Sequence, residues 1–227
     1  MPRPELVIAI DGPAGSGKST TAKAVANALA LAHLDSGALY RAVTLAALRR
    51  GVAIERRTLG SLARSGTVGL ALRDDEYVPT LEGIDVSEAV RSDDVTAAVS
   101  AVAAAPEVRE WVNEELRRAA ADHPKGVVVD GRDIGTVVFP EARLKIFLTA
   151  EVAVRARRRA IQDGGSLASE DLHALGAVIA ARDKADSRRD VAPLKPASDA
   201  LILDSTALSF DQQVSRIVEL ARRSHVD

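Results

Sequence analysis

The chain has 227 residues and a formal net charge of −2, so it can bury a proper core in one domain or two small ones, and no general attraction to nucleic acid or to an anionic membrane is expected. It has no cysteine, which excludes a disulfide framework, a thiolate metal site and a cysteine nucleophile. Neither a signal peptide nor a segment long enough to span a membrane is evident. We therefore expect a soluble cytoplasmic protein, and a monomer because no coiled-coil seam is found.

The first predicted elements enclose a phosphate-binding motif. The apolar run Leu6–Asp11 predicts a buried strand, and residues from Lys18 to about Leu31 predict a helix with one apolar face. The intervening glycines let backbone N–H groups turn inward as an anion-binding nest at the positive end of that helix. We expect Lys18 to reach the β- and γ-phosphates and the Ser19 hydroxyl to bind Mg²⁺. The G-x-x-x-x-G-K-S motif thus predicts a nucleoside triphosphate site at Gly12, Pro13, Ala14, Gly15, Ser16, Gly17, Lys18, Ser19 and Thr20.

The next elements are a short strand near residues 32–35 and a helix that Gly51 ends. After them come three short segments with alternating or continuous apolar residues and turn residues between them, which predict a small antiparallel sheet. Helices are expected near residues 94–104 and from Pro106 onward. The segments of the small sheet are 68–72, 77–81 and 84–86.

Three short apolar runs in the second half predict strands buried on both faces of a parallel sheet. They are Val127–Val129, Leu144–Leu148 and Ala200–Leu203. Between the last two, we expect two helices broken at residues 163–166. A capping box, Ser209-x-x-Gln212, opens the final helix, whose core stripe is predicted as Phe210, Val214, Ile217, Val218 and Ala221. Strands that alternate with helices predict a doubly wound α/β core with ligands beyond the carboxyl ends of the strands.

Polar residues follow two of these strands directly. Ser36 begins the helix after the second strand, where it either caps that helix or contacts a ligand, and Arg41 lies near the same end. Asp130 follows the strand Val127–Val129 and either holds Mg²⁺ or caps a turn. Two classes of P-loop protein remain at this point, a kinase and a switch NTPase. The switch class normally needs an N-K-x-D motif, and neither Asn27 nor Asn113 precedes a lysine, which favours a kinase.

Four motifs together resemble the family of bacterial cytidylate kinases, over residues 5–223. They are the P-loop, Asp35-Ser36-Gly37-x-x-Tyr40-Arg41, Asp130-Gly131-Arg132-Asp133-x-Gly135-Thr136-Val137-Val138-Phe139-Pro140 and Val191-Ala192-Pro193-Leu194. The resemblance implies the α/β nucleoside monophosphate kinase fold, with a five-stranded parallel sheet flanked by helices. It implies a single kinase domain with a core at 1–35, 106–150 and 190–227, a monophosphate-binding insert with a small antiparallel sheet at 36–105, and a helical lid at 151–189. The implied reaction is Mg²⁺-dependent transfer of the ATP γ-phosphate to CMP or dCMP.

The resemblance also implies roles for individual residues. Arg182 and Asp186 would hold the ribose, and Arg189, Arg41 and Arg132 the CMP phosphate, with Ser36 beside them. Asp133 and Arg109 would read the cytosine base, with Ser100 nearby and Tyr40 in the substrate site. The implied catalytic set is Lys18, Arg132, Arg158, Arg182 and Arg189, and Ser19 and Asp130 are the implied metal ligands.

The residues taken alone leave other interpretations open. Arg182, Asp186 and Arg189 are spaced to share one helix face, where surface salt bridges would be worth under ~1 kcal/mol. The arginine run at 155 and 157–159 is typical of a solvated helix face, or of a nucleic-acid patch, which the net charge disfavours. Arg109 fits an exposed helix surface. AMP, UMP and shikimate are alternative acceptors for a P-loop kinase of this kind.

Overall fold

The computed structural model describes residues 6–189 and 191–224. Within them the chain forms two compact units: the first comprises residues 30–127, and the second comprises residues 6–29 together with 128–224. This division groups residues 30–35 and 106–127 with the predicted monophosphate-binding insert rather than with the core. Among the described residues, no helix is both long and apolar enough to cross a bilayer.

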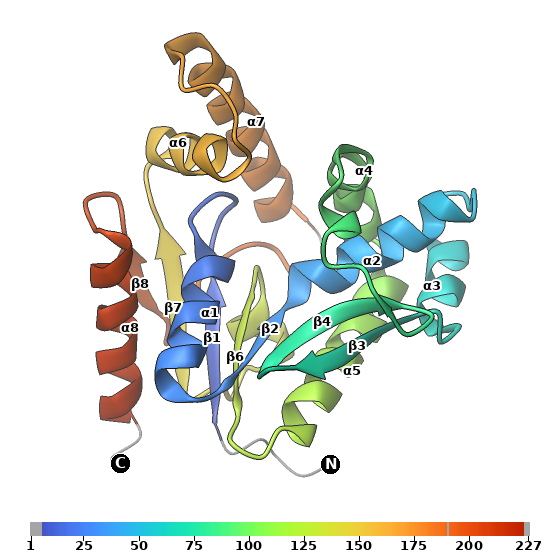
Figure 1. Cartoon of the computed structure of the whole chain (residues 1–227), viewed down its shortest axis with the longest axis horizontal. Helices are drawn as coiled ribbons and strands as arrows, with labels where there is room; N and C mark the ends of the chain where they lie inside the picture. Colours follow the sequence, from blue (N-terminus) through green and yellow to red (C-terminus); the bar gives the residue numbers. More distant parts are fainter. Residues whose placement is uncertain (1–5, 190, 225–227) are drawn as a thin grey trace. The chain divides into compact units, whose positions relative to one another are not determined.

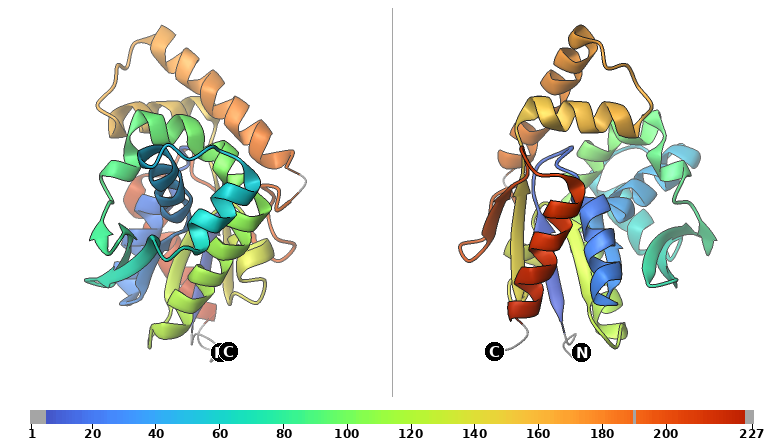
Figure 2. Two further views of the ribbon diagram at one scale, coloured as in Figure 1. Left: turned by 90° about the vertical axis from the view of Figure 1, so that its right-hand side faces the viewer. Right: turned by 60° about the vertical axis from the view of Figure 1, so that its left-hand side comes forward.

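The second unit is built on parallel strands that bury the start of the P-loop. Its strand order is β6-β1-β7-β8, with β1 parallel to β7 and β7 parallel to β8. All five residues of β1 are buried, as its continuous apolar run predicts. Helices α1 and α8 lie side by side along this sheet (Figures 1 and 2). The bounds are β1 (Val7–Asp11), α1 (Lys18–Leu29), β6 (Val127–Gly131), β7 (Leu144–Thr149), β8 (Leu201–Asp204) and α8 (Phe210–Ser224).

Helices α6 (Val152–Gln162) and α7 (Ser169–Ser187) form a hairpin that follows β7 (Figure 2). The predicted break at 163–166 is confirmed, because α6 ends at Gln162 and Gly164 takes a positive φ of 65°. The turn therefore lies at one end of the hairpin. The first turns of α6 and the last turns of α7 lie together at the other end.

The prediction that β8 is buried like the other strands is wrong. Leu201 is 47% exposed and Ile202 66% exposed. Strand β8 ends the strand order and has a sheet neighbour on one side only, whereas β1 and β7 are flanked on both sides. An apolar run of four residues predicts a strand, but its position in the sheet decides whether the strand is covered.

In helix α8 the capping box is confirmed, since the Ser209 amide donates to Gln212 Oε1 at 2.9 Å and the Gln212 amide donates to Ser209 Oγ at 3.2 Å. The predicted core stripe is wrong at its first residue, because Phe210 is 48% exposed. Gln213 is buried in its place, with its amide hydrogen-bonded to Thr21 of α1. Further along, Ile217 is fully buried.

The first unit contains the predicted antiparallel strands, which are confirmed, but they do not form a separate sheet. β4 pairs antiparallel with β3 and β5, and it also pairs in parallel with β2, where His33 lies opposite Glu76. The predicted helices near residues 94–104 and from Pro106 onward begin within one residue of their expected starts. The bounds are β2 (Ala32–Asp35), α2 (Ser36–Arg49), β3 (Val68–Arg73), β4 (Glu76–Leu81), β5 (Ile84–Asp85), α4 (Asp93–Ala103) and α5 (Pro106–Asp122).

One helix of this unit, α3 (Arg56–Arg64), was not predicted from the sequence. Its interior glycine, Gly60, lowers helix propensity. The glycine is needed for packing, because a Cβ at this position would lie 2.7 Å from the Cβ of Glu107 on α5. Arg64 also pairs with Glu114 of α5 at 2.7 Å. Packing against α5 therefore explains why a glycine stands inside this helix.

The burial pattern of α8 makes a prediction about stability. Ile217→Ala should lower the free energy of unfolding by about 3 kcal/mol, because it removes a fully buried side chain and leaves a cavity. Phe210→Ala, on the same helix, should cost less than about 1 kcal/mol because the ring is half exposed. Urea denaturation followed by circular dichroism measures both. Equal losses for the two variants would contradict the burial seen here.

Candidate functional site

The P-loop joins β1 to α1 and lies against β7. At Gly12, which follows β1 directly, a Cβ would come 2.0 Å from the carbonyl oxygen of Leu148, so no other residue fits without moving the backbone. Gly15 and Gly17 take positive φ angles of 72° and 86°. The predicted strand, glycine-rich loop and helix are therefore present in the order that a phosphate-binding nest requires.

Lys18 is buried at the start of α1, and its Nζ donates to the carbonyl oxygen of Pro13 at 2.7 Å. Burial, together with the nearby positive charge of Arg132, lowers the pKa of Lys18 to about 7. The ammonium group is thus held inside the loop by a backbone carbonyl, in surroundings where it loses its proton more readily than a lysine in water.

Ser19 and Asp130 meet although they are 111 positions apart in the chain. The Ser19 hydroxyl donates to Asp130 Oδ2 at 2.6 Å. Asp130 is buried on β6, beside the first turn of α1. Hydroxyl and carboxylate oxygens are hard ligands of the kind Mg²⁺ uses, and Mg²⁺ typically takes one or two carboxylates plus substrate phosphates. The two predicted metal ligands therefore fit that ion by chemistry and by proximity.

Asp11, the last residue of β1, lies in the site, although no role was assigned to it from the sequence. Its carboxylate accepts from the backbone N–H of Ile134 at 2.8 Å and of Gly135 at 2.7 Å. Burial raises the pKa of Asp11 to about 6, although the two amides act in the opposite direction. At neutral pH the carboxylate is ionised, and it fixes the backbone that directly follows Asp133, which is itself buried.

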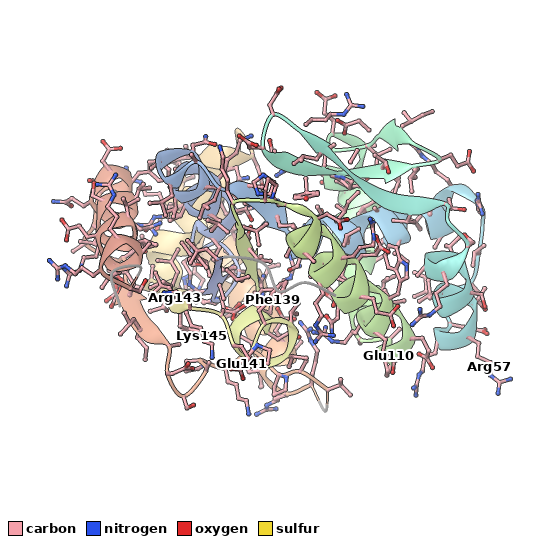
Figure 3. The ribbon with its side chains drawn as sticks, turned by 90° about the horizontal axis from the view of Figure 1, so that it is seen from below. Arg57, Glu110, Phe139, Glu141, Arg143 and Lys145 are labelled. Atoms are coloured by element: carbon pink, nitrogen blue, oxygen red, sulfur yellow. The ribbon has the colours of Figure 1, made fainter. Side chains whose placement is uncertain are left out.

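Lys145 of β7 contacts the same backbone segment. Lys145 lies close to the segment around Phe139 and Glu141, as Figure 3 shows, and its Nζ donates to the carbonyl oxygen of Pro140. A Cβ at Gly135 would lie 3.1 Å from Cδ of Lys145 and 3.4 Å from Oδ2 of Asp11, so both side chains pack closely against this glycine. The loop after β6 is therefore rigidly placed by its neighbours.

Asp186 pairs with two of the predicted phosphate-binding arginines. Arg132 Nε lies 3.0 Å from Asp186 Oδ2, and Arg189 Nη2 contacts Asp186 Oδ1. Burial alone would raise the pKa of Asp186, but the two guanidinium groups outweigh it and hold this pKa below its usual range. The three side chains are largely buried, so the interpretation as surface salt bridges is wrong. We call these residues the Arg132–Asp186–Arg189 cluster.

The predicted shared helix face is wrong for Arg189. Helix α7 ends at Ser187, so Arg189 reaches Asp186 from the segment beyond the helix. Arg182 does lie on α7, one turn before Asp186, and is half-buried. The cluster thus combines the loop after β6, the last turn of α7 and the segment that follows.

The arginines of α6 differ in exposure and in partners according to their position on the helix. Arg157 is exposed and Arg159 pairs with Asp163 at the end of the helix, as a solvated face predicts. Arg158, the predicted phosphate ligand, donates to Ser205 Oγ at 2.9 Å and to the Ser205 carbonyl at 2.8 Å. Arg155 is buried against the P-loop, so the prediction of a solvated face is wrong there. Helical phase explains this division, because Arg155 and Arg158 are three residues apart and share one face.

Sequence reasoning missed two P-loop contacts, Arg155 and Asp183. Arg155 donates to the carbonyl oxygen of Ala14, and Asp183 accepts from the amide of Ala14. Asp183 directly follows Arg182. Roles were assigned from the sequence to Arg182, Asp186 and Arg189 in this stretch, but none to Asp183. Arg155 and Asp183 are 28 positions apart, and no pattern in the sequence relates them. They meet because α6 and α7 fold back on each other.

In the first unit, two predicted residues are close to each other. The Arg109 guanidinium lies 5.5 Å from the centroid of the Tyr40 ring, a cation–π geometry, and it donates to the Ala103 carbonyl at 2.9 Å. Arg109 is buried, so its interpretation as an exposed helix residue is wrong. Ser100 is exposed on α4.

The other two predicted residues of this unit lie on α2. Arg41 donates to the Val90 carbonyl at 3.1 Å and to Thr96 Oγ1 at 2.8 Å. Ser36 is buried as the first residue of the helix, but the cap is Asp35, whose carboxylate accepts from the Ala38 amide at 3.2 Å. The alternative role of Ser36 as helix cap is therefore wrong, and its hydroxyl is not needed for that purpose.

The chain is similar to known proteins over nearly its whole length. Residues 8–223 match the family model described as cytidylate kinase. The chain is 47% identical to a cytidylate kinase of Exiguobacterium sibiricum, covering 96% of this chain and 97% of that one, and 45% identical to one of Geobacillus sp. strain WCH70 with the same coverage. A crystal structure of an uncharacterized protein from Eubacterium ventriosum shares the fold, with a TM-score of 0.52 at 12% identity, covering 96% of this chain and 99% of that one.

The lowered pKa of Lys18 predicts proton uptake on nucleotide binding. At pH 8 the free amine is mostly neutral, and the negative charges of a bound triphosphate should restore the ammonium form. Binding of ATP should then take up about 0.9 proton at this residue. Isothermal titration calorimetry in buffers of different ionisation enthalpy measures the uptake.

The matched control is Lys18→Arg, whose guanidinium is protonated throughout this range. Protons exchanged by ATP itself are common to both proteins, so the difference between them reports Lys18. An uptake that is the same in both proteins would contradict the lowered pKa. The same linkage means that ATP affinity falls as the pH rises above 7.

Proposed function

This chain belongs to the cytidylate kinase family and is a phosphotransferase, and we propose that it transfers the γ-phosphoryl group of ATP to CMP or dCMP, giving ADP and CDP or dCDP. The observation that carries the proposal is the pairing of Arg132 and Arg189 with Asp186 in the same unit as the P-loop. A P-loop alone binds a triphosphate, but partly buried guanidinium groups outside it are what an anionic acceptor requires.

The donor nucleotide would bind at the P-loop. Backbone amides of the nest and the dipole of α1 would receive its phosphates, and Lys18 would leave the Pro13 carbonyl for a phosphate oxygen. Ser19 and Asp130 would hold Mg²⁺, which supplies Lewis-acid neutralisation of phosphate charge when bound. Lys18 and Arg158 would stabilise the charge that spreads over the oxygens of the transferring group.

The acceptor phosphate would be held by arginines. Arg132 and Arg189 already bind a carboxylate, and guanidinium groups grip carboxylate and phosphate oxygens with the same planar geometry. We propose Arg41 and Ser36 as further phosphate ligands, with Arg182 and Asp186 at the ribose. A CMP phosphate oxygen would attack in line, without a covalent intermediate or an essential general base, because phosphoryl transfer depends on positioning and charge neutralisation.

Base selectivity would depend on Asp133 and Arg109, with Ser100 and Tyr40 as neighbours of the base. A buried carboxylate accepts from the exocyclic amine of cytosine but repels O4 of uracil, and an arginine donates toward N3 or O2. The burial of Asp133 and Arg109 supports this role, since polar groups in such surroundings discriminate strongly against a mismatched partner. We further propose that the protein acts as a cytoplasmic monomer on small molecules, without nucleic acid or membrane.

The decisive test follows ADP release with CMP, dCMP, UMP, AMP, shikimate and no acceptor. The proposal expects rapid release with CMP and dCMP and little without an acceptor. Lys18→Ala should lower turnover by at least about 10²-fold while the circular dichroism spectrum is unchanged. Full-rate hydrolysis without any acceptor would favour a switch NTPase, and preference for another acceptor would replace CMP.

Base selectivity has its own test. CMP should be preferred over UMP by at least about 10²-fold in kcat/KM, and Asp133→Ala should reduce that ratio about tenfold or more. The KM for ATP should change by less than about threefold. Asp171→Ala, at an exposed position of α7, is the matched control and should leave the ratio unchanged. Unchanged selectivity in Asp133→Ala would remove this residue from the base site.

A further inference from the structure

The backbone of Ala14, in the middle of the P-loop, is bound on both sides by charged side chains of the α6–α7 hairpin. Its N–H donates to Asp183 Oδ1 at 2.8 Å, and its carbonyl accepts from Arg155 Nη1 at 2.9 Å. The two side chains also contact each other, through Arg155 Nη1 and Asp183 Oδ2. Arg155 Nε is used as well, donating to the Ala150 carbonyl at 2.9 Å.

This contact between the hairpin and the P-loop is buried. The side chain of Arg155 is 7% exposed and that of Asp183 16% exposed. Beside them, the side chain of Ala14 packs with Ala156 of α6 and Ile179 of α7. A Cβ at Gly15 would lie 3.1 Å from the Arg155 carbonyl, so the loop backbone touches the helix itself. A shift of α7 relative to the P-loop would therefore disturb buried charges as well as packing.

Asp183 shares the last turns of α7 with the acceptor-side residues. Arg182 precedes it directly, and Asp186, which pairs with Arg132 and Arg189, follows three residues later. Residues three apart on a helix lie on neighbouring positions of its surface. One rigid turn of helix thus carries both the contact with the P-loop and the contact with the Arg132–Asp186–Arg189 cluster.

We propose that Asp183, held by Arg155, is a positioning residue that couples ATP binding at the P-loop to CMP binding at the Arg132–Asp186–Arg189 cluster. The inference rests on the proposed function for the identity of the two nucleotides. Two ligands that favour the same position of α7 bind with positive cooperativity, and the coupling is reciprocal by thermodynamic necessity. Asp183 touches neither nucleotide in this account and acts through the Ala14 peptide.

The test measures a coupling factor, the Kd of CMP alone divided by its Kd in the presence of the β,γ-methylene analogue of ATP. Isothermal titration calorimetry gives both values. We expect a factor of at least about five for the unmodified protein. Asp183→Asn keeps the size of the side chain but removes the charge that holds Arg155, and it should reduce the factor to less than about two.

The matched control is Asp163→Asn. Asp163 also pairs with an arginine of α6, Arg159, through an N–O contact of 2.6 Å, but this pair is exposed and lies away from the P-loop. Its coupling factor should stay within about twofold of the unmodified value. If Asp183→Asn does not fold, Arg155→Lys replaces it, because an ammonium cannot bind Ala14, Ala150 and Asp183 as the planar fork does.

Three outcomes would overturn the proposal. The unmodified protein could show a factor near one, or Asp183→Asn could keep the full factor. Alternatively, Asp183→Asn could lower the thermal midpoint and weaken both nucleotides equally while the factor stays intact, which is the result for a purely structural residue. If CMP does not bind the unmodified protein, the proposed function fails by itself, and the same measurement with the acceptor found by ADP release then tests the coupling.

Discussion

The P-loop unit depends on one electrostatic constraint: several positively charged side chains around the P-loop are wholly or partly removed from water, and their charges need partners. Lys18, Arg155 and Arg132 are buried or partly buried here. A buried cation without partners is costly, so the fold supplies its own acceptors. The carboxylates of Asp183 and Asp186 and the carbonyls of Pro13 and Ala14 fill this role. The cations are thereby held in place in advance of the ligand.

This advance placement suits the chemistry of phosphoryl transfer. Catalysis by charge neutralisation works best when donors and dipoles are fixed before the reaction, because no reorganisation is then needed. Gly12 packs closely against β7, which fixes the loop after β1. The Asp11 carboxylate accepts two backbone N–H groups, which fixes the loop after β6. Burial shifts the pKa of Lys18 down and that of Asp11 up, both toward the neutral pH range, so the charge of these two groups responds to a charged ligand.

The contacts described here between the α6–α7 hairpin and the P-loop lie at one end of the hairpin. Arg155, Ala156, Ile179 and Asp183 hold that end to the P-loop, whereas the turn near Gly164 lies at the opposite end of both helices. A closure that preserves these contacts moves the turn more than the anchored end. The lid at 151–189 stays a prediction, and these contacts mean that its hinge would lie at the anchored end of the hairpin.

Local patterns in the sequence determined the P-loop, the alternation of strands and helices, the break at 163–166 and the capping box at Ser209, because each depends on neighbouring residues and on backbone geometry. The family motifs added the site residues. Among these, Ser19 contacts Asp130, and Asp186 contacts both Arg132 and Arg189. Only the tertiary structure decided the exposure of β8 and Phe210, the helix around Gly60, and the roles of Asp11, Arg155 and Asp183. These depend on partners that are distant in the chain or on a place in the sheet, and no periodicity along the chain records which distant backbone amide a carboxylate will meet.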